Sequence, residues 1–142
     1  MDKFKLNTAI KNLQQQKSDL PQALAEATQQ YFNKSFDNQA FNGTPWQDVK
    51  RHFKKGGNNK PILQQTGALK TAVSKSLVKT DFKTIKFEVT GVPYAAVHNE
   101  GLKASRGKGF KMPKRQFIGH TDQLTQIQKD IIQTYISKIW PK

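Results

Sequence analysis

The sequence predicts an α+β fold, in which a small antiparallel sheet, made of a hairpin plus a further strand, packs against two long helices, one near each terminus. Residues 84–90 alternate strictly between apolar and polar side chains, which is typical of a strand with one buried face. Near both ends of the chain, apolar residues recur at three- and four-residue steps, which is typical of helices with one buried face.

The first helical pattern covers residues 3–17, and we expect residues 1–17 to form a flexible helical arm that becomes ordered on a partner. Its apolar face consists of Leu6, Ile10 and Leu13. A separate second helix is expected from Asp19, because its carboxylate can accept first-turn amides and Pro21 is tolerated in a first turn. The apolar stripe of this second helix consists of Leu20, Leu24, Ala27 and Tyr31.

The middle of the chain is less regular. Residues 33–60 contain several turn-forming residues, so we expect a long surface segment that Trp46 anchors. After Pro61 we expect a turn into a short helix, and then a strand at residues 73–80. Only three residues, 81–83, separate this strand from the alternating one, which predicts a hairpin that needs other elements to cover its apolar face.

The last part of the chain is predicted to contain a helical turn at residues 94–100, a mobile basic loop at residues 101–111 and a long helix after Gly119. The basic residues of the loop are Lys103, Arg106, Lys108 and Lys111. The apolar stripe of the last helix consists of Leu124, Ile127, Ile131, Tyr135 and Ile139.

Length and composition limit the class of protein. With 142 residues and no cysteine, the chain is expected to form a single domain, 1–142, without disulfides or thiolate metal sites. We expect neither a signal peptide nor a membrane-spanning segment, since no long apolar run is present. The formal net charge of +14 favours nucleic acid or acidic protein surfaces as partners.

No recognisable catalytic, cofactor or metal site is expected. His98 and Glu100 are residue types that can bind a metal ion or act as a general base. Their side chains would point away from each other, however, because residues two apart lie on different faces of a helix. His52 and His120 belong to no ligand pair, and the glycines around Lys108 lack P-loop spacing. The basic loop is equally compatible with a solvated segment and with one that contacts DNA phosphates or an acidic neighbouring subunit.

Three segments together resemble the phage virion morphogenesis family, which includes tail-completion proteins. They are Lys60-Pro61-Ile62-Leu63-Gln64-Gln65-Thr66-Gly67-Ala68-Leu69, Val92-Pro93-Tyr94-Ala95-Ala96-Val97-His98-Asn99-Glu100-Gly101 and Met112-Pro113-Lys114-Arg115-Gln116-Phe117-Ile118-Gly119. Thr44-Pro45-Trp46 precedes them, so the resemblance runs from about Thr44 to the C-terminus. Gln116 departs from the family pattern, which often has proline there.

The resemblance implies a small α+β structural protein of a tailed phage, made in the host bacterial cytoplasm and located in the virion. Such proteins act in tail completion or head–tail joining at the neck or tail end, often as a homo-oligomeric ring, for instance a hexamer. It further implies that Gly67 permits a tight turn and that His98 and Asn99 fix the end of a short helix. The expected partners are sister copies, neighbouring neck, connector or tail proteins and, non-specifically, packaged DNA, without a membrane.

From this resemblance we expect six residues to contact sister subunits or other partners: Tyr94, His98, Asn99, Glu100, Arg115 and Phe117. Arg115 would pair with a carboxylate on the next subunit. Two alternatives stay open. The first is a stand-alone basic DNA-binding protein, and the second, less favoured, is a metal-dependent nuclease that uses His98 and Glu100.

Overall fold

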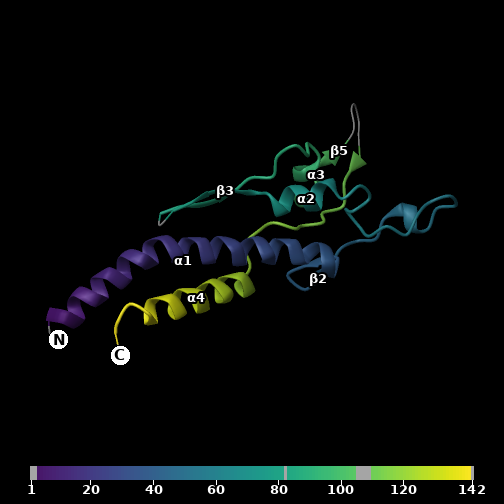
Figure 1. Ribbon diagram of the computed structural model, residues 1–142. Helices are drawn as coiled ribbons and strands as arrows, with labels where there is room; N and C mark the ends of the chain where they lie inside the picture. Colours follow the sequence, from purple (N-terminus) through teal and green to yellow (C-terminus); the bar gives the residue numbers. More distant parts are fainter. Residues whose placement is uncertain (1–2, 82, 105–109, 142) are drawn as a thin grey trace. The chain divides into compact units, whose positions relative to one another are not determined.

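The computed structural model describes residues 3–81, 83–104 and 110–141. The elements follow in the order α1 (Lys3–Asn38), β1 (Ala40–Phe41), β2 (Thr44–Pro45), the 3-10 helix η1 (Lys50–His52), α2 (Ala68–Ser74), β3 (Leu77–Thr80), β4 (Ile85–Phe87), α3 (Ala95–Glu100), β5 (Lys103–Ala104), β6 (Phe110–Lys111) and α4 (Asp122–Ser137) (Figure 1). The predicted α+β class, with long helices near both termini, is confirmed.

The strands of the described residues form three separate antiparallel pairs, β1 with β2, β3 with β4 and β5 with β6. The predicted hairpin is therefore present as β3–β4. The expectation that a further strand extends the same sheet was wrong, because the other strands pair locally with one another.

Helix α1 corrects the prediction of two N-terminal helices. It runs without interruption from Lys3 to Asn38, with Pro21 in its interior and not in a first turn. Residues on one face of α1 are buried at helical spacing as far as Phe36, although the sequence was expected to become irregular from Asn33. These buried residues are Ala25, Thr28, Phe32, Ser35 and Phe36.

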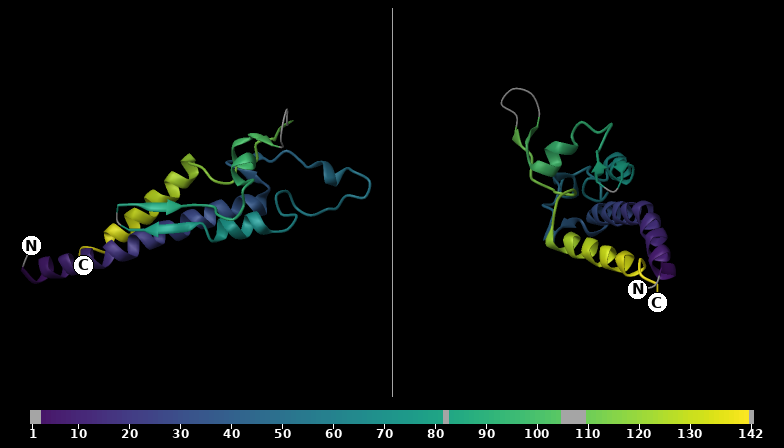
Figure 2. Two further views of the ribbon diagram at one scale, coloured as in Figure 1. Left: turned by 90° about the horizontal axis from the view of Figure 1, so that it is seen from above. Right: turned by 90° about the vertical axis from the view of Figure 1, so that its left-hand side faces the viewer.

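The chain forms two compact units that we describe separately: Met1–Gln29 with Leu77–Phe87 and His120–Lys142, and Gln30–Ser76 with Glu88–Gly119. In the first unit, α4 runs antiparallel to the N-terminal part of α1 (Figures 1 and 2). The Asn12 side chain donates a hydrogen bond to the Ile139 carbonyl at 3.0 Å, and the Gln128 amide donates one to the Thr28 hydroxyl at 3.0 Å.

The β3–β4 hairpin completes the first unit. Leu77 pairs with Phe87 and Thr80 with Ile85, with an irregularity in register between Leu77 and Lys79. The Asp81 carboxylate accepts hydrogen bonds from the backbone N–H groups of Lys83 and Thr84, at 2.8 and 2.7 Å, and so stabilises the turn. The strands are shorter than predicted, because residue 73 belongs to α2 and only residues 85–87 of the alternating segment lie in a strand.

The second unit has an aromatic core. The Phe36 ring lies 5.5 Å from that of Trp46 and 5.6 Å from that of Phe117, measured between centroids. Leu69 and Val73 of α2 are fully buried.

Helix α2 begins after Gly67, whose φ of 78° is in the left-handed region, so the tight turn that the resemblance implies for Gly67 is present. The expected anchoring role of Trp46 is also confirmed, since its ring is buried and its indole N–H is hydrogen bonded.

Candidate functional site

Helix α3 carries the candidate residues of the second unit. It is held to the core by Val92 and Ala95, which are both buried. It ends at Gly101, whose φ is 69° and whose N–H donates to the Val97 carbonyl at 3.0 Å. A Cβ atom on Gly101 would also lie 3.0 Å from Cβ of Lys114. Glycine is thus required here both by the backbone conformation and by the close approach of the following segment.

Asn99 fastens the end of α3 to the segment at residues 115–118. Its side-chain Oδ1 accepts hydrogen bonds from the backbone N–H groups of Phe117 and Ile118, each at 3.0 Å. Beside it, the Arg115 N–H donates to the His98 carbonyl at 2.8 Å. The helix end is therefore joined to a distant part of the sequence, and Asn99 makes the joint through its side chain.

Arg115 connects the same segment to residues 46–48. Its side chain is only 5% exposed; Nε donates to the Gln47 carbonyl at 2.7 Å and Nη2 to the Asp48 carbonyl at 2.9 Å. In the other direction, the Trp46 indole N–H donates to the Gln116 carbonyl at 2.8 Å. Burial lowers the pKa of the Arg115 guanidinium, and the nearby charge of Arg51 lowers it further.

His98 is half-buried at the centre of this arrangement. Its ring meets the Tyr94 ring edge-to-face, with centroids 5.8 Å apart, and its Nδ1 atom is buried without a hydrogen-bond partner within the described part of the chain. Burial lowers the pKa of the His98 imidazole below its usual range, and the positive charge of Arg115 lowers it further. Both effects favour the neutral form of the imidazole.

His98 and Arg115 lie between two depressions in the surface of the second unit. One has a volume of about 270 Å³ and is also lined by Arg51, Thr66 and Tyr94. The other has a volume of about 540 Å³ and is also lined by Phe110 and Met112. Residues from all three segments of the resemblance meet here, although they are separated by up to about 50 positions in the sequence.

The structure assigns different positions to the six predicted contact residues. Phe117 lies in the aromatic core and is 1% exposed, while Arg115 and Asn99 make their hydrogen bonds within the chain. Tyr94 and Glu100 are exposed on the surface. The exposed Tyr94 and Glu100 are thus the members of the set that can meet a partner without rearrangement, and partner contact by any of the six stays a prediction.

The basic loop is partly ordered into strands. Lys103 of β5 lies directly opposite Lys111 of β6, so the predicted basic loop, residues 101–111, begins and ends in a short pair of strands, and its mobility stays a prediction. Arg106 and Lys108 lie outside the described residues. Like charges in directly opposed positions are unfavourable unless an anion lies near them.

The histidines make separate local contacts. His52 contacts the Asp48 carboxylate and the Lys60 carbonyl, and His120 contacts the Thr125 hydroxyl. Within residues 3–81, 83–104 and 110–141, no three His, Cys, Asp or Glu side chains are grouped to hold a metal ion. The same residues include no helix that is long and apolar enough to span a membrane.

The sequence pattern did not indicate that residues 47 and 48 contact Arg115. They take part through their backbone carbonyl oxygens, which accept from Arg115. A backbone acceptor has no side-chain signature, so residue types alone could not have indicated it.

A scan against protein families matches residues 3–137 to the phage virion morphogenesis family. The chain belongs to this family. The match starts well before Thr44, where the resemblance in the motifs began, and so includes nearly all of α1. Searches of curated proteins and of solved structures found no match. For this phage virion morphogenesis protein, the site around α3 is a structural joint at which the motifs meet.

Proposed function

We propose that this virion morphogenesis protein acts in tail completion, as one subunit of a homo-oligomeric ring at the neck or tail end that joins tails to filled heads. The observation that carries the proposal is the match to the phage virion morphogenesis family over residues 3–137. The geometry of the candidate site supports a role without a covalent step. Asn99 and Arg115 are engaged with backbone groups, and the Glu100 carboxylate accepts from the Asn99 amide at 2.9 Å.

The test is the position of the protein in the particle. Particles purified from infected cells should contain the chain at a fixed number of copies, and imaging at side-chain resolution should locate it at the neck or tail end. A phage that lacks the gene should accumulate heads and tails that do not join, and expression of the chain in trans should restore joining. Absence of the chain from purified wild-type particles would contradict the proposal.

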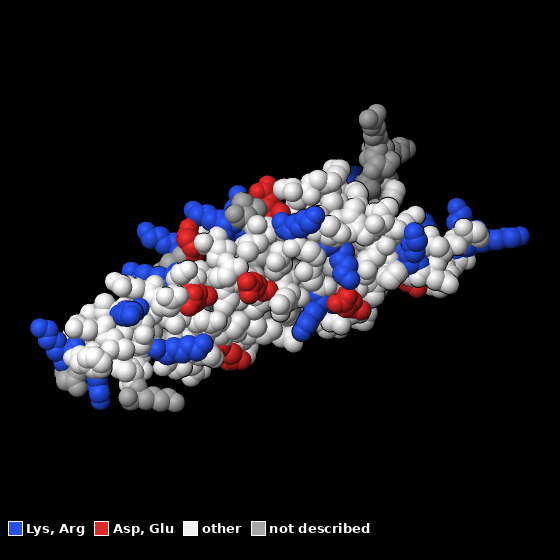
Figure 3. All heavy atoms as spheres, in the orientation of Figure 1, with Lys and Arg blue, Asp and Glu red and all other residues white. Residues whose placement is uncertain are grey.

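One observation favours contact with DNA as a second candidate function. Lys103 and Lys111 face each other across β5 and β6, where an anion would relieve their repulsion. On the face seen in Figure 3, in contrast, lysine and arginine side chains are spread out with acidic side chains between them. The strand ends are therefore the more specific candidate for phosphate contact.

If these lysines contact phosphates, duplex DNA binding should weaken steeply with salt, and the log–log slope should fall by roughly 2 in a Lys103→Gln, Lys111→Gln double variant, about 1 per contact. Lys70→Gln is the matched control, because the Lys70 ammonium already lies 3.1 Å from the Asp37 carboxylate. Fluorescence anisotropy at several salt concentrations measures the slope. An unchanged slope in the double variant would exclude this contact.

A further inference from the structure

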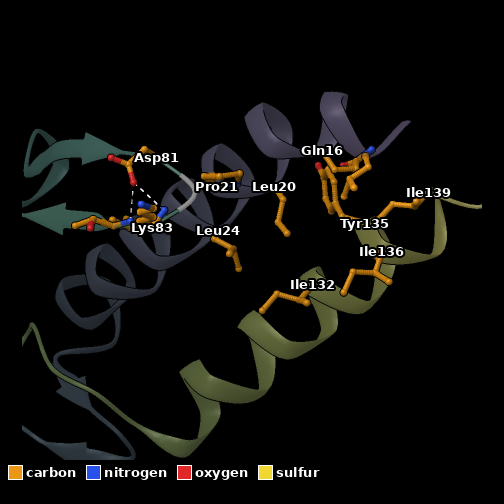
Figure 4. A pocket seen from close by; sticks show the side chains of 13 residues that line it. Gln16, Leu20, Pro21, Leu24, Asp81, Lys83, Ile132, Tyr135, Ile136 and Ile139 are labelled. Carbon is orange, nitrogen blue, oxygen red and sulfur yellow. Dashed lines mark hydrogen bonds between the residues drawn. The ribbon is translucent and has the colours of Figure 1, made fainter. Parts of the chain in front are cut away.

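An apolar groove of about 610 Å³ lies within the first unit, between α1 and α4. Figure 4 shows Leu20 and Leu24 of α1 facing Ile132 and Ile136 of α4 across the open space. The turn of the β3–β4 hairpin contributes Asp81 and Lys83 to its border, and almost all the other lining side chains are apolar. Open apolar surface of this extent on a protein usually marks a place where another chain binds.

The helix that borders the groove also has an uncovered apolar stripe, formed by Leu6, Ile10 and Leu13. These side chains are 47%, 47% and 42% exposed. Leu13 already lines the groove, and the same face continues at alternating steps of four and three residues through Lys17 to Leu20 and Leu24. Such spacing is typical of a helix face that packs against another helix. The part of this face from Leu13 onward therefore borders the groove, while Leu6 and Ile10 stay about half exposed among the residues that the structure describes.

Gln16 supplies a second, independent sign that something enters the groove. Its side chain lines the groove and is 9% exposed, but its Oε1 atom has no hydrogen-bond partner among the residues that the structure describes. A buried acceptor without a donor is unfavourable. An occupant that brings an N–H group to this position would satisfy it.

We infer that the groove receives the stripe helix, residues 3–13, of a second copy of this chain. The proposed ring function is the basis of this inference. The groove is open and mainly apolar, and the stripe is an exposed apolar helix face, so each copy supplies a surface that the next one can cover. The stripe helix also carries donors for the Gln16 acceptor, in the amide of Asn7 and the ammonium groups of Lys3 and Lys11.

Charge agrees with this occupant. Residues 3–18 contain four lysines and no acidic residue. Asp81 and Lys83 both line the groove, so their opposite charges offset each other there, and the additional acidic residue is Asp19, next in sequence to the groove residue Leu20. Few charged groups would be buried between the stripe and the groove. A mainly apolar contact suits a chain of formal net charge +14, because copies of such a chain repel each other.

The contact joins two different surfaces, the stripe of one copy and the groove of the next. Head-to-tail contacts of this kind propagate from copy to copy and form a closed ring where the rotation between copies permits it. The inference therefore gives a physical basis for ring formation and names the two surfaces that form it.

The test uses two complementary variants. Ile10→Asp disables the stripe and leaves the groove intact, whereas Ile136→Asp disables the groove and leaves the stripe intact. Each alone should weaken association by roughly 100-fold or more, because an unpaired carboxylate would be buried at the interface. Mixed together, they should form a one-to-one dimer, since one intact stripe meets one intact groove. Light scattering after size-exclusion chromatography measures these masses.

Two controls place the same new charge on the outer faces of the same helices, Ser18→Asp on α1 and Thr134→Asp on α4, where both residues are exposed. They should assemble as the wild type does, and circular dichroism should show all four variants folded. The inference is overturned if Ile10→Asp and the wild type have the same mass at every concentration. This includes the outcome in which both proteins are monomers.

Particles separate this inference from the proposed function. Ile10→Asp should fail to complement a phage that lacks the gene, while Ser18→Asp should succeed. If Ile10→Asp enters particles as the wild type does, the groove contact is wrong although the proposed function stands. If the wild-type chain is absent from particles, the proposed function fails whatever masses are measured in solution.

Discussion

At the scale of single residues, Asn99 shows how a short polar side chain can determine the path of the backbone. Its Oδ1 atom accepts from two successive backbone N–H groups, those of Phe117 and Ile118. Phe117 is in the core and both hydrogen bonds are partly buried, so these N–H groups depend on Asn99 for a partner. The side chain thus secures both the end of α3 and the entry of Phe117 into the aromatic core.

Asn99→Ala should lower the free energy of unfolding by about 1–3 kcal/mol, because two backbone donors lose their acceptor. Asn99→Asp keeps an oxygen in position and should lose less. Denaturant unfolding of the three proteins measures the differences, and Asn59→Ala, in an exposed position, is the control. A loss for Asn99→Ala no larger than that for Asn59→Ala would contradict the role given to Asn99.

His98 should make stability depend on pH. Its folded pKa is lowered by burial and by Arg115, so below the ordinary value of about 6.5 the unfolded chain binds a proton that the folded chain does not. The contribution of His98 to the free energy of unfolding is therefore fully present above pH 6.5. It decreases as the pH falls from 6.5 towards the lower pKa of the folded state. His98→Phe keeps a ring beside Tyr94 and should remove this part of the decrease.

The measurement is the free energy of unfolding at several pH values between 7.5 and 5. His120→Gln, which removes an exposed imidazole far from His98 in the sequence, controls for the loss of a histidine as such. Equal slopes for His98→Phe and the wild type would show that His98 titrates alike in both states.

At the scale of elements, the sequence allowed the α+β class, the hairpin, the short helix at α3 and the C-terminal helix to be predicted. Helix α1 was missed as a single element because Asp19 and Pro21 together have the local chemistry of a helix start. Pro21 and Ala25, one turn further along α1, are both buried, which indicates that packing of this helix face offsets the missing N–H group of the proline. Helix propensities of neighbouring residues do not report this packing, because it depends on the tertiary fold.

The boundary between α2 and β3 was missed for a different reason. Val73 is fully buried in α2, and short apolar segments of this kind fit a helix or a strand equally well. For the candidate site, the motifs pointed to the right residues, but the partners of Arg115 are carbonyl groups of residues 47 and 48. Their positions depend on tertiary folding, which periodicity does not report.

The start of α4 offers a test of one element. The Thr121 hydroxyl accepts from the Leu124 N–H at 3.0 Å, and Thr121 is buried. Thr121→Ala should lower the free energy of unfolding by about 1 kcal/mol through loss of the helix cap. Thr121→Ser keeps the hydroxyl and should remain close to the wild type, as measured by thermal unfolding. Equal losses for both variants would point to packing of the threonine methyl group instead.

At the scale of the whole molecule, the two compact units share one continuous helix. Residues up to Gln29 of α1 belong to the first unit, and those from Gln30 to the second. Breaking α1 at this boundary would leave helix ends with unsatisfied backbone groups. The length of the chain predicts a single domain, and the shared helix gives a reason for the two units to unfold together.

Trp46 lies in the second unit and Trp140 in the first, so the chain carries a probe for each. In Trp140→Phe, the fluorescence of Trp46 should follow the same denaturant transition as far-UV circular dichroism, to which α1 and α4 contribute most. Coincident midpoints are expected for a single cooperative domain. Separate midpoints would contradict the prediction of one domain and would identify the second unit as an independent folding element.

The hydrogen bonds that hold β5 and β6 have a practical consequence. The Met112 N–H donates to the Leu102 carbonyl at 2.9 Å, and Ala104 is paired with Phe110, so the chain is secured on either side of residues 105–109. Lengthening a closed connection costs little, about 0.6 kcal/mol for each doubling. An epitope or a small fluorescent label inserted between these two anchored strands should therefore leave the fold intact.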